Sequence, residues 1–207
     1  MTEPVRRPRW PGADLPGRRI FVAVPLPDGA TAAVTELVES VRADGVPGGG
    51  RDVRWVRLDG LHLTLRFLGP TLEARIEPAR TAIRETAARS APFELSIGGA
   101  GAFPSAARPR ALWLGVHDAS GELRRLAGVV DEALVSAGWP AETRPFAAHL
   151  TLARSDGVPA GARIGARLAS AAASFRISVQ VDRVGLFESL TGGGPARYVP
   201  LELLELG

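Results

Sequence analysis

The pattern of apolar and polar positions predicts short β-strands that alternate with amphipathic helices. Several segments carry apolar residues at helical spacing, and others are short apolar or alternating runs bounded by Gly and Pro. Helices are predicted at about 28–45, 78–89, 121–137 and 159–173, and strands at 19–24, 53–56, 92–97, 110–116, 175–179, 184–187 and 198–204. Residues 1–18 are predicted to form a flexible basic tail, and the Gly-rich segments 48–50 and 98–101 to connect elements.

The tetrapeptide His-Leu-Thr-Leu occurs twice, at residues 62–65 and 149–152, and each copy is predicted to begin a strand. Side chains alternate between the two faces of a strand. Each copy therefore places its His and Thr on one face and its two Leu on the other. The leucines suit a core, and the imidazole and hydroxyl groups suit a polar cleft. His117, the third histidine, lacks this context and is predicted to lie in a surface loop.

The two halves of the chain repeat the order strand, helix, motif strand, helix, strand. Similar segments follow each second helix, at 93–97 and 175–179, and a Phe-x-Ser follows at 103–105 and 187–189. Duplicated halves commonly pack about a pseudo-two-fold axis, which would bring the two motif strands together. We expect an α+β fold with two similar lobes of mostly antiparallel sheet backed by helices. Residues 19–207 then form one bilobal domain with its site in the cleft between the lobes.

Composition excludes several classes of site. The 207 residues include no Cys, which excludes disulfides, a thiolate nucleophile and Cys-ligated zinc. All 25 basic residues are Arg, yet the formal net charge is only +3, so the arginines reflect composition as readily as phosphate binding. The first 19 residues lack the apolar run of a signal peptide, and no stretch approaches the apolar length of a membrane span. We therefore expect a cytoplasmic protein that does not enter the membrane.

The paired motif allows four interpretations. Two His without an acidic partner or a third ligand do not make a zinc site. The serines nearest to the motifs lack the surroundings of a hydrolase nucleophile. A structural role is reasonable for one lone His but is disfavoured by the repeated His-x-Thr. Paired general acid–base catalysis remains, because imidazole titrates near neutral pH and one His can be neutral while the other is protonated.

An in-line opening of a phosphodiester needs a general base and a general acid. A base acts on the attacking oxygen and an acid acts on the leaving oxygen, on opposite sides of phosphorus. The hydroxyls of Thr64 and Thr151 can hold the non-bridging oxygens, where charge builds in the transition state. A cation is also expected nearby, and both Arg66 and Arg154 follow the motifs closely enough to reach the ends of the strands.

At these residues the chain resembles the two-histidine (2H) phosphoesterase superfamily, and in particular its RNA 2′,3′-cyclic phosphodiesterase branch, first named for 2′-5′ RNA ligase activity. The resemblance covers about residues 19–204. It is carried by Phe21-Val-Ala-Val-Pro-Leu-Pro, His62-Leu-Thr-Leu-Arg-Phe-Leu-Gly, Phe93-Glu-Leu with Gly101-Ala-Phe-Pro, Leu112-Trp-Leu-Gly-Val and Phe146-Ala-Ala-His-Leu-Thr-Leu-Ala-Arg.

The resemblance implies hydrolysis of a 2′,3′-cyclic phosphate to a 2′-phosphomonoester without a metal or other cofactor. It makes His62 the proton donor to the leaving 3′ oxygen and His149 the base that activates water. Thr64, Thr151 and Arg154 then bind the phosphate of the substrate. The family usually has Pro before the second His, where this chain has Ala148.

Arg154 sets a geometric condition, because it lies five residues after His149 and would face away from the site on a regular strand. It reaches the site only if the strand ends or bulges near Ala153. Phe21, Trp55 and Phe146 are candidates for stacking on a base, although apolar residues on strands more commonly lie in the core.

The expected partner is RNA or a nucleotide with a 2′,3′-cyclic phosphate, and no protein partner is indicated, so we expect a monomer. Two alternatives stay open at this point. One is a cyclic phosphodiesterase that acts on small nucleotides of the cyclic ADP-ribose phosphate type. The other is a non-catalytic module that binds RNA ends in the same cleft.

Overall fold

The computed structural model describes residues 16–43, 53–155, 159–192 and 194–207. Its strands are β1 (Arg18–Pro25), β2 (Val53–Trp55), β3 (His62–Thr71), β4 (Phe93–Phe103), β5 (Ala111–His117), β6 (His149–Ser155), β7 (Arg176–Val181), β8 (Arg183–Leu190) and β9 (Arg197–Glu205). Its α-helices are α1 (Asp28–Ala43), α2 (Ile76–Ala88), α3 (Glu122–Ser136) and α4 (Pro159–Ala171). None of the described helices is long and apolar enough to cross a membrane.

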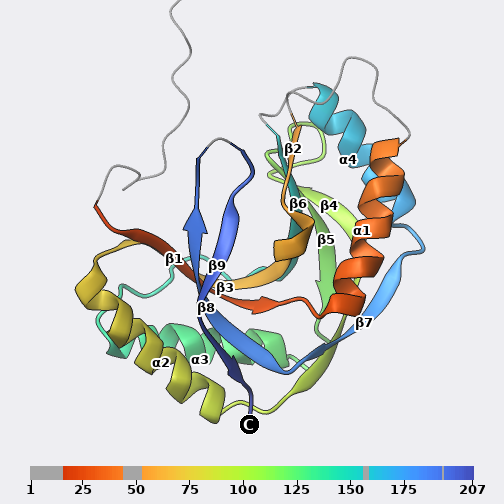
Figure 1. Ribbon diagram of the computed structural model, residues 1–207. Helices are drawn as coiled ribbons and strands as arrows, with labels where there is room; N and C mark the ends of the chain where they lie inside the picture. Colours follow the sequence, from red (N-terminus) through yellow and green to blue (C-terminus); the bar gives the residue numbers. More distant parts are fainter. Residues whose placement is uncertain (1–15, 44–52, 156–158, 193) are drawn as a thin grey trace, which may run out of the picture.

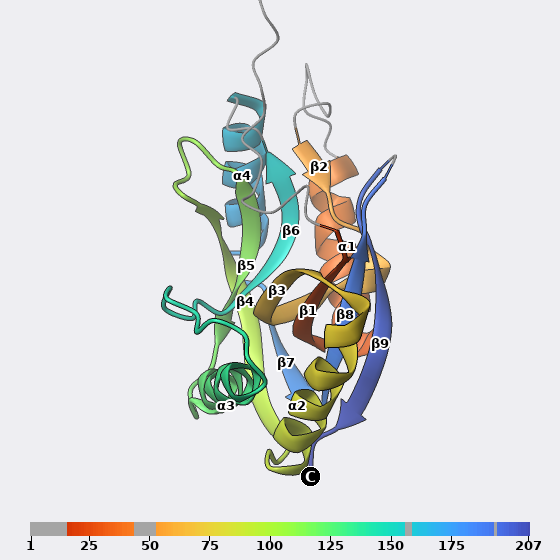
Figure 2. The same cartoon turned by 90° about the vertical axis from the view of Figure 1, so that its left-hand side faces the viewer.

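The strands form two antiparallel sheets that face each other, which confirms the predicted α+β class (Figures 1 and 2). One sheet has the order β3-β1-β8-β9 and the other has the order β2-β6-β5-β4-β7. In each sheet the motif strand lies beside the strand that begins its half of the chain: β3 pairs with β1, and β6 pairs with β5. The pseudo-symmetric arrangement expected from the repeated sequence is therefore present.

The two sheets do not coincide with the two halves of the sequence. Strand β4, from the first half, joins the sheet of the second motif, because it pairs with the next strand, β5, as consecutive antiparallel strands commonly do. Strand β8, from the second half, joins β1 in the sheet of the first motif. Each half thus contributes strands to both sheets, and the interleaving fixes the two motif strands relative to each other.

The helices pack in two pairs at opposite ends of the molecule (Figure 2). Helix α2 packs against α3, and α1 packs against α4, so each pair joins elements from both halves. The apolar residues at helical spacing form the buried face of each helix. In α1 this face includes Val34, Leu37, Val38 and Val41, all at most 9% exposed. These stripes and the inner faces of the sheets make one continuous core.

The Gly-rich segment at 98–101 is not a connector, as the sequence suggested, but part of strand β4. Its glycines make room for close neighbours. A Cβ on Gly98 would lie 2.5 Å from the carbonyl oxygen of Phe175, and one on Gly101 would overlap the ring of Trp113. Close approach of a backbone or an aromatic ring is a common reason for Gly within a strand.

Two other expectations fall wholly or partly on residues that the structure does not describe. Residues 1–15 of the predicted tail lie outside the described residues, and Arg18, which was assigned to the tail, already belongs to β1 and lies 2.7 Å from Glu188. The predicted end of the first helix near Gly45 and the loop at 48–50 also lie outside them.

Candidate functional site

The two motif strands lie in contact although they belong to different sheets. In both of them the predicted alternation holds. The four leucines are at most 7% exposed, whereas both His and both Thr are at least partly accessible. The leucines are Leu63, Leu65, Leu150 and Leu152. Core packing of these leucines therefore turns both His-x-Thr pairs toward accessible space between the sheets.

A bulge in β6 brings Arg154 to the same face as the motif. Trp113 of β5 pairs with Thr151, but the preceding residue, Leu112, pairs with Ala153, so Leu152 has no partner. Leu152 and Ala153 are both buried in succession, which reverses the alternation and leaves Arg154 exposed. The geometric condition set by the sequence is met, and Arg154 lines the same cavity as His62.

The first motif strand carries a matching bulge with a different outcome. On β1, Ala23 pairs with Thr64 and Val22 pairs with Arg66, so Leu65 is skipped. Arg66 is consequently buried, and Phe67 takes the exposed position that Arg154 has in β6. The sequence did not single out Phe67. The signal available was the alignment of the two motifs, once a bulge had been assumed in both.

Two adjoining cavities flank the motifs. The first, the His62 cavity, has a volume of about 360 Å³ and is lined by residues that include His62, Thr64, Arg154 and Tyr198; a small recess of about 50 Å³ beside it reaches Thr151. The second, the His149 cavity, has a volume of about 580 Å³. Its lining includes His149, and Thr64 belongs to both cavities. All five candidate site residues therefore line cavities that adjoin at Thr64.

Both motif histidines are held in the same way. The Nδ1 atom of His62 lies 2.7 Å from the carbonyl oxygen of Gly60, and Nδ1 of His149 lies 2.7 Å from that of Ala147. A carbonyl oxygen only accepts, so Nδ1 is the donor in both rings, and Nε2 is left for a substrate. The hydrogen bond of His149 forms although Ala148 replaces the family's proline.

Aromatic rings surround each imidazole. The His62 ring is 4.8 Å from Phe21 and 4.6 Å from the edge-on ring of Tyr198, measured between centroids. The His149 ring lies 5.1 Å from Phe103, again edge-on. Rings at these distances restrict the rotation of the imidazoles and exclude water from one side of them.

Burial lowers the pKa of His62 below its usual value. The positive charges of Arg154 and His149 lower this pKa further, while the hydrogen bond to Gly60 opposes the shift. The neutral form of His62 is thus favoured in the free protein. A phosphate anion bound between these three positive or potentially positive groups would act in the opposite direction and favour protonation.

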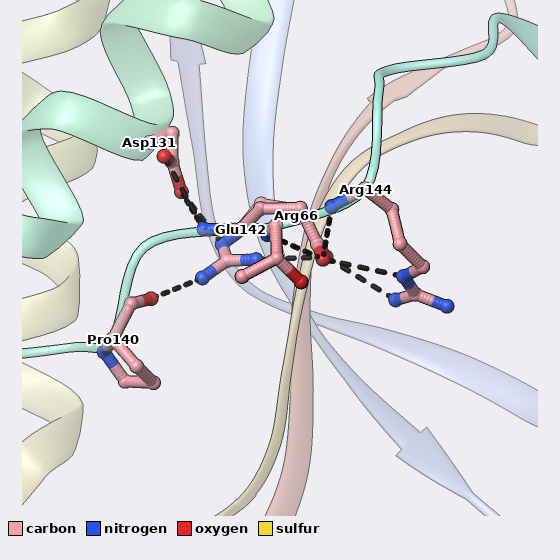
Figure 3. A network of polar contacts seen from close by, with 6 residues as sticks. Arg66, Asp131, Pro140, Glu142 and Arg144 are labelled. Atoms are coloured by element: carbon pink, nitrogen blue, oxygen red, sulfur yellow. Dashed lines mark hydrogen bonds and ion pairs between the residues drawn. The ribbon is translucent and has the colours of Figure 1, made fainter.

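Arg66 does not reach the site as a free cation, contrary to the expectation from the sequence (Figure 3). Its side chain is only 8% exposed, with Nε 3.0 Å from Asp131 of α3 and Nη1 2.8 Å from Glu142. It also donates to the carbonyl oxygen of Pro140. Arg66 therefore ties the first motif strand to α3 and to the segment that leads into the second motif strand.

Glu142 is the centre of this network. Its pKa is lowered to about 2, first by the hydrogen bond from the Arg144 side chain and also by the positive charge of Arg66. Its Oε1 atom also accepts hydrogen bonds from the backbone N–H groups of Thr143 and Arg144. The carboxylate consequently shapes the turn that precedes His149.

The other residues considered in the sequence analysis lie in different parts of the structure. His117 is exposed, as predicted, although it ends β5 instead of lying in a loop, and it lines neither motif cavity. Phe21 is 3% exposed and packs on His62. Trp55 and Phe146 are half-buried and line the His62 and His149 cavities, respectively.

Besides Phe67, the His62 cavity is lined by Arg19, Arg54 and Tyr198, which were not anticipated from the sequence. Arg19 and Tyr198 come from strands that are far from either motif in the sequence. Arg54 lies opposite Arg154 in the pairing of β2 with β6. No local motif marks them, because only strand pairing brings them to the site. Among the described residues there is no group of three or more His, Asp or Glu that could hold a metal ion.

Comparison with known proteins gives the same family. The model of the 2′-5′ RNA ligase superfamily matches residues 24–193. A Methanothermobacter thermautotrophicus protein named RNA 2′,3′-cyclic phosphodiesterase is 31% identical over 192 residues, which cover 91% of this chain and 98% of that protein. A Geobacillus stearothermophilus protein of the same name is 39% identical over 137 residues, 65% of this chain, but the match spans only 41% of that protein.

Solved structures agree. A protein described as a phosphoesterase superposes with a TM-score of 0.69 at 27% identity, over 92% of this chain and 98% of that one. Escherichia coli LigT in complex with 3′-AMP superposes with a TM-score of 0.66 at 27% identity, over 91% and 98% of the two chains. With its duplicated His-x-Thr strands and this extent of similarity, the chain belongs to the 2′-5′ RNA ligase superfamily.

Proposed function

We propose that this protein is an RNA 2′,3′-cyclic phosphodiesterase that works without a metal, with His62 as general acid and His149 as general base. The observation that carries the proposal is the matched pair of imidazoles. Each is fixed through Nδ1 to a backbone carbonyl and has Nε2 left for a substrate, and the cavities that the two rings line adjoin at Thr64. Relatives named for this activity support the substrate class.

In the proposed reaction, a water molecule on the His149 side attacks phosphorus. His149 Nε2 accepts a proton from the water as its oxygen bonds to phosphorus. The bond between phosphorus and the 3′ oxygen breaks, and His62 donates its Nε2 proton to that oxygen. The product carries a free 3′ hydroxyl and a 2′-phosphomonoester. His149 ends protonated and His62 neutral, so proton exchange with solvent restores the starting state.

Thr64, Thr151 and Arg154 are proposed to bind the non-bridging oxygens. All three line the recess beside His62, and Thr64 also lines the His149 cavity. Negative charge grows on these oxygens as the water adds, so donors fixed in place stabilise the transition state more than the ground state. Arg154 lines this recess together with both threonines, where its guanidinium can contact a bound phosphate.

The lowered pKa of His62 is compatible with its role as the acid once substrate is bound. In the free protein burial and the charge of Arg154 favour the neutral ring. The cyclic phosphate brings a negative charge to the same place and favours the protonated ring. Because the whole site comes from one chain, we further propose that the protein acts as a monomer.

The test uses a 2′,3′-cyclic mononucleotide with excess chelator present. We expect turnover to a 2′-phosphate, identified by chromatography against 2′- and 3′-phosphate standards. Absence of turnover that returns on adding a divalent metal would overturn the metal-free mechanism. Binding of RNA ends without any turnover would favour a binding module. A cyclic ADP-ribose phosphate assayed in parallel would indicate a small-nucleotide enzyme if it proved the much better substrate.

A further inference from the structure

His149 is oriented by a backbone carbonyl that lies outside regular secondary structure. Its Nδ1 atom donates to the carbonyl oxygen of Ala147, 2.7 Å away. Residues 139–148, between α3 and β6, form neither helix nor strand, so this carbonyl is not set by a regular ladder of hydrogen bonds. Residue 148 is Ala and not Pro, so the covalent chain does not restrict Ala147 to extended conformations. The direction of the His149 ring therefore depends on how this segment is held.

The ends and the middle of the segment are held differently. Trp139 and Phe146 pack partly against the core near its two ends. Between them, the Arg66 side chain contacts the carboxylate of Glu142 and the carbonyl oxygen of Pro140 (Figure 3). The middle of the segment is thus fastened by a charged side chain that comes from β3.

Arg66 also relates this segment to the first motif. It lies two residues after Thr64, which lines both cavities. Its Nε atom lies 3.0 Å from Asp131, so α3 is part of the same network. Strands β3 and β6 belong to different sheets. Through Arg66, the segment that leads to His149 is therefore located relative to Thr64 on the other side of the site.

The burial of Arg66 indicates a role other than stability. Its side chain is only 8% exposed. A buried ion pair is often no more stabilising than apolar side chains of similar volume, and its best-attested use is to select one arrangement of the elements that it joins. An apolar residue at position 66 could fill the same space, but it could not hold Pro140 and Glu142 in one geometry.

From these observations we propose that Arg66 is a positioning residue for His149. Together with Asp131 and Glu142 it sets the path of the segment before β6. This path places the carbonyl oxygen of Ala147 and thereby sets the direction of His149 Nε2. The proposal rests on the role of His149 as general base that is proposed above. Orientation matters for such a group, because a misplacement of about 1 Å can lower the rate about 10²-fold.

The kinetics of Arg66→Met measure the effect on rate. With a 2′,3′-cyclic mononucleotide we expect kcat to fall about 10–10²-fold while KM changes little. The reason is that Arg66 lines the His149 cavity, where the water is proposed to attack, and not the His62 cavity. Glu142→Gln breaks the network more mildly and should give a smaller loss of the same kind.

Arg84→Met is a matched control. Arg84 joins α2 to β9 through two contacts with Glu202, at 2.6 and 3.0 Å, and it lines neither motif cavity. Its replacement removes an ion pair between two elements just as Arg66→Met does, but kcat should stay at the wild-type value. Thermal unfolding of each variant checks that the fold is intact at the assay temperature.

A double-variant cycle shows whether Arg66 acts through His149. If it does, the loss of Arg66 has no further effect once the base is absent. Arg66→Met combined with His149→Ala should then lose no more kcat than His149→Ala alone. A merely structural role of Arg66 would lower the residual activity again by the full factor.

The orientation of the ring can also be followed without any substrate. Nitrogen NMR shows which ring nitrogen of a neutral imidazole carries the proton. In the wild type both His62 and His149 should carry it on Nδ1, because both donate to a carbonyl oxygen. In Arg66→Met, His149 should become a mixture of the two tautomers. His62 should not change, because its acceptor, Gly60, lies outside the network.

The inference is overturned if Arg66→Met and Glu142→Gln both keep the wild-type kcat, or if the loss in Arg66→Met recurs in full on the His149→Ala background. A change of the His62 ring as large as that of His149 would also overturn it, as would an equal loss of kcat in Arg84→Met. If the wild type did not turn over the substrate, the proposed function would fail, and the tautomer of His149 in Arg66→Met would still decide whether Arg66 positions the ring.

Discussion

Phe67 and Arg154 occupy equivalent positions in the two motif strands. Each lies five residues after its histidine and follows a bulge at a leucine, Leu65 or Leu152, that turns it to the face of the site. The repeat thus presents a ring in one copy and a cation in the other. The site is therefore symmetric in its His-x-Thr pairs and asymmetric around them, as the different tasks of the proposed acid and base would require.

Arg154 is expected to influence His62 as well as the phosphate. Its charge contributes to the lowered pKa of His62, so Arg154→Gln should raise that pKa, as followed by NMR titration of the ring. The same variant should lower kcat/KM by about 10–10³-fold, because a charge-assisted contact to the transition state is lost. An unchanged pKa together with normal kinetics would place Arg154 outside the working site.

The threonine hydroxyls are expected to matter for rate and not for stability. Thr64 is exposed and Thr151 is half-buried, so Thr→Val keeps the shape and the strand preference of the side chain while it deletes a donor. For each variant kcat/KM should fall by about 10–10³-fold with little change in Tm. A lowered Tm with normal kinetics would mean that the hydroxyls are structural.

The Glu142 network gives a pH-dependent contribution to stability. The pKa of Glu142 in the folded protein is about 2, below its ordinary value of 4.5, so the ionised carboxylate stabilises the fold. This contribution is present above about pH 4.5 and is lost as the pH falls toward 2.

Denaturant unfolding of the wild type and Glu142→Gln at several pH values measures this contribution of Glu142 to stability. The wild type should be the more stable at pH 6, and the difference should shrink steadily below pH 4.5. A difference in unfolding free energy that stayed constant across this range would show that the ionisation of Glu142 does not stabilise the fold.

The sequence predicted those parts of the fold and site that local patterns encode. The duplicated motif located the two histidines and threonines, and alternation with leucines predicted their face. Strand parity gave the condition for Arg154, that β6 must end or bulge near Ala153, and the structure has the bulge. Residues whose position depends on partners distant in the sequence were not predicted correctly. Arg66 carries a charge that is neutralised by Asp131 of α3 and by Glu142 of the segment after α3. Arg19 reaches the site only through the pairing of β1.

The prediction that the Gly-rich part of β4 is a connector was wrong for a related reason. Glycines at 98–101 read locally as a break, yet the sheet needs small residues there because Trp113 and the backbone at Phe175 come close. The cause is long-range packing, which no window of the sequence contains.

The three histidines provide a test of the paired acid and base. His62→Ala and His149→Ala should each lower turnover by about 10²–10⁴-fold, whereas His117→Ala should not, because it lies outside both cavities. The wild-type kcat/KM should trace a bell against pH with two macroscopic pKa values that belong to the pair. Equal damage from His117→Ala would refute the argument from duplication.

The residual activity of each variant shows which limb of the bell its histidine supplies. Without His62 the remaining requirement is a neutral His149, so activity should rise with pH to a plateau. Without His149 the requirement is a protonated His62, so activity should fall as pH rises. Burial and the charge of Arg154 still lower the pKa of His62 in this variant, so the fall in kcat/KM should lie below the pH expected for an ordinary histidine. The opposite pair of profiles would mean that the roles are exchanged.

A change of leaving group tests the same assignment by chemistry alone. An ester with a good leaving group in place of the 3′ oxygen needs little protonation as its bond to phosphorus breaks, whereas its attack by water still needs a base. Such a substrate should therefore restore most of the activity lost in His62→Ala and little of that lost in His149→Ala. Because only the acid becomes dispensable, the rescue is independent of the pKa values of both rings. Rescue of His149→Ala alone would exchange the two roles, and equal rescue of both variants would rule out the mechanism.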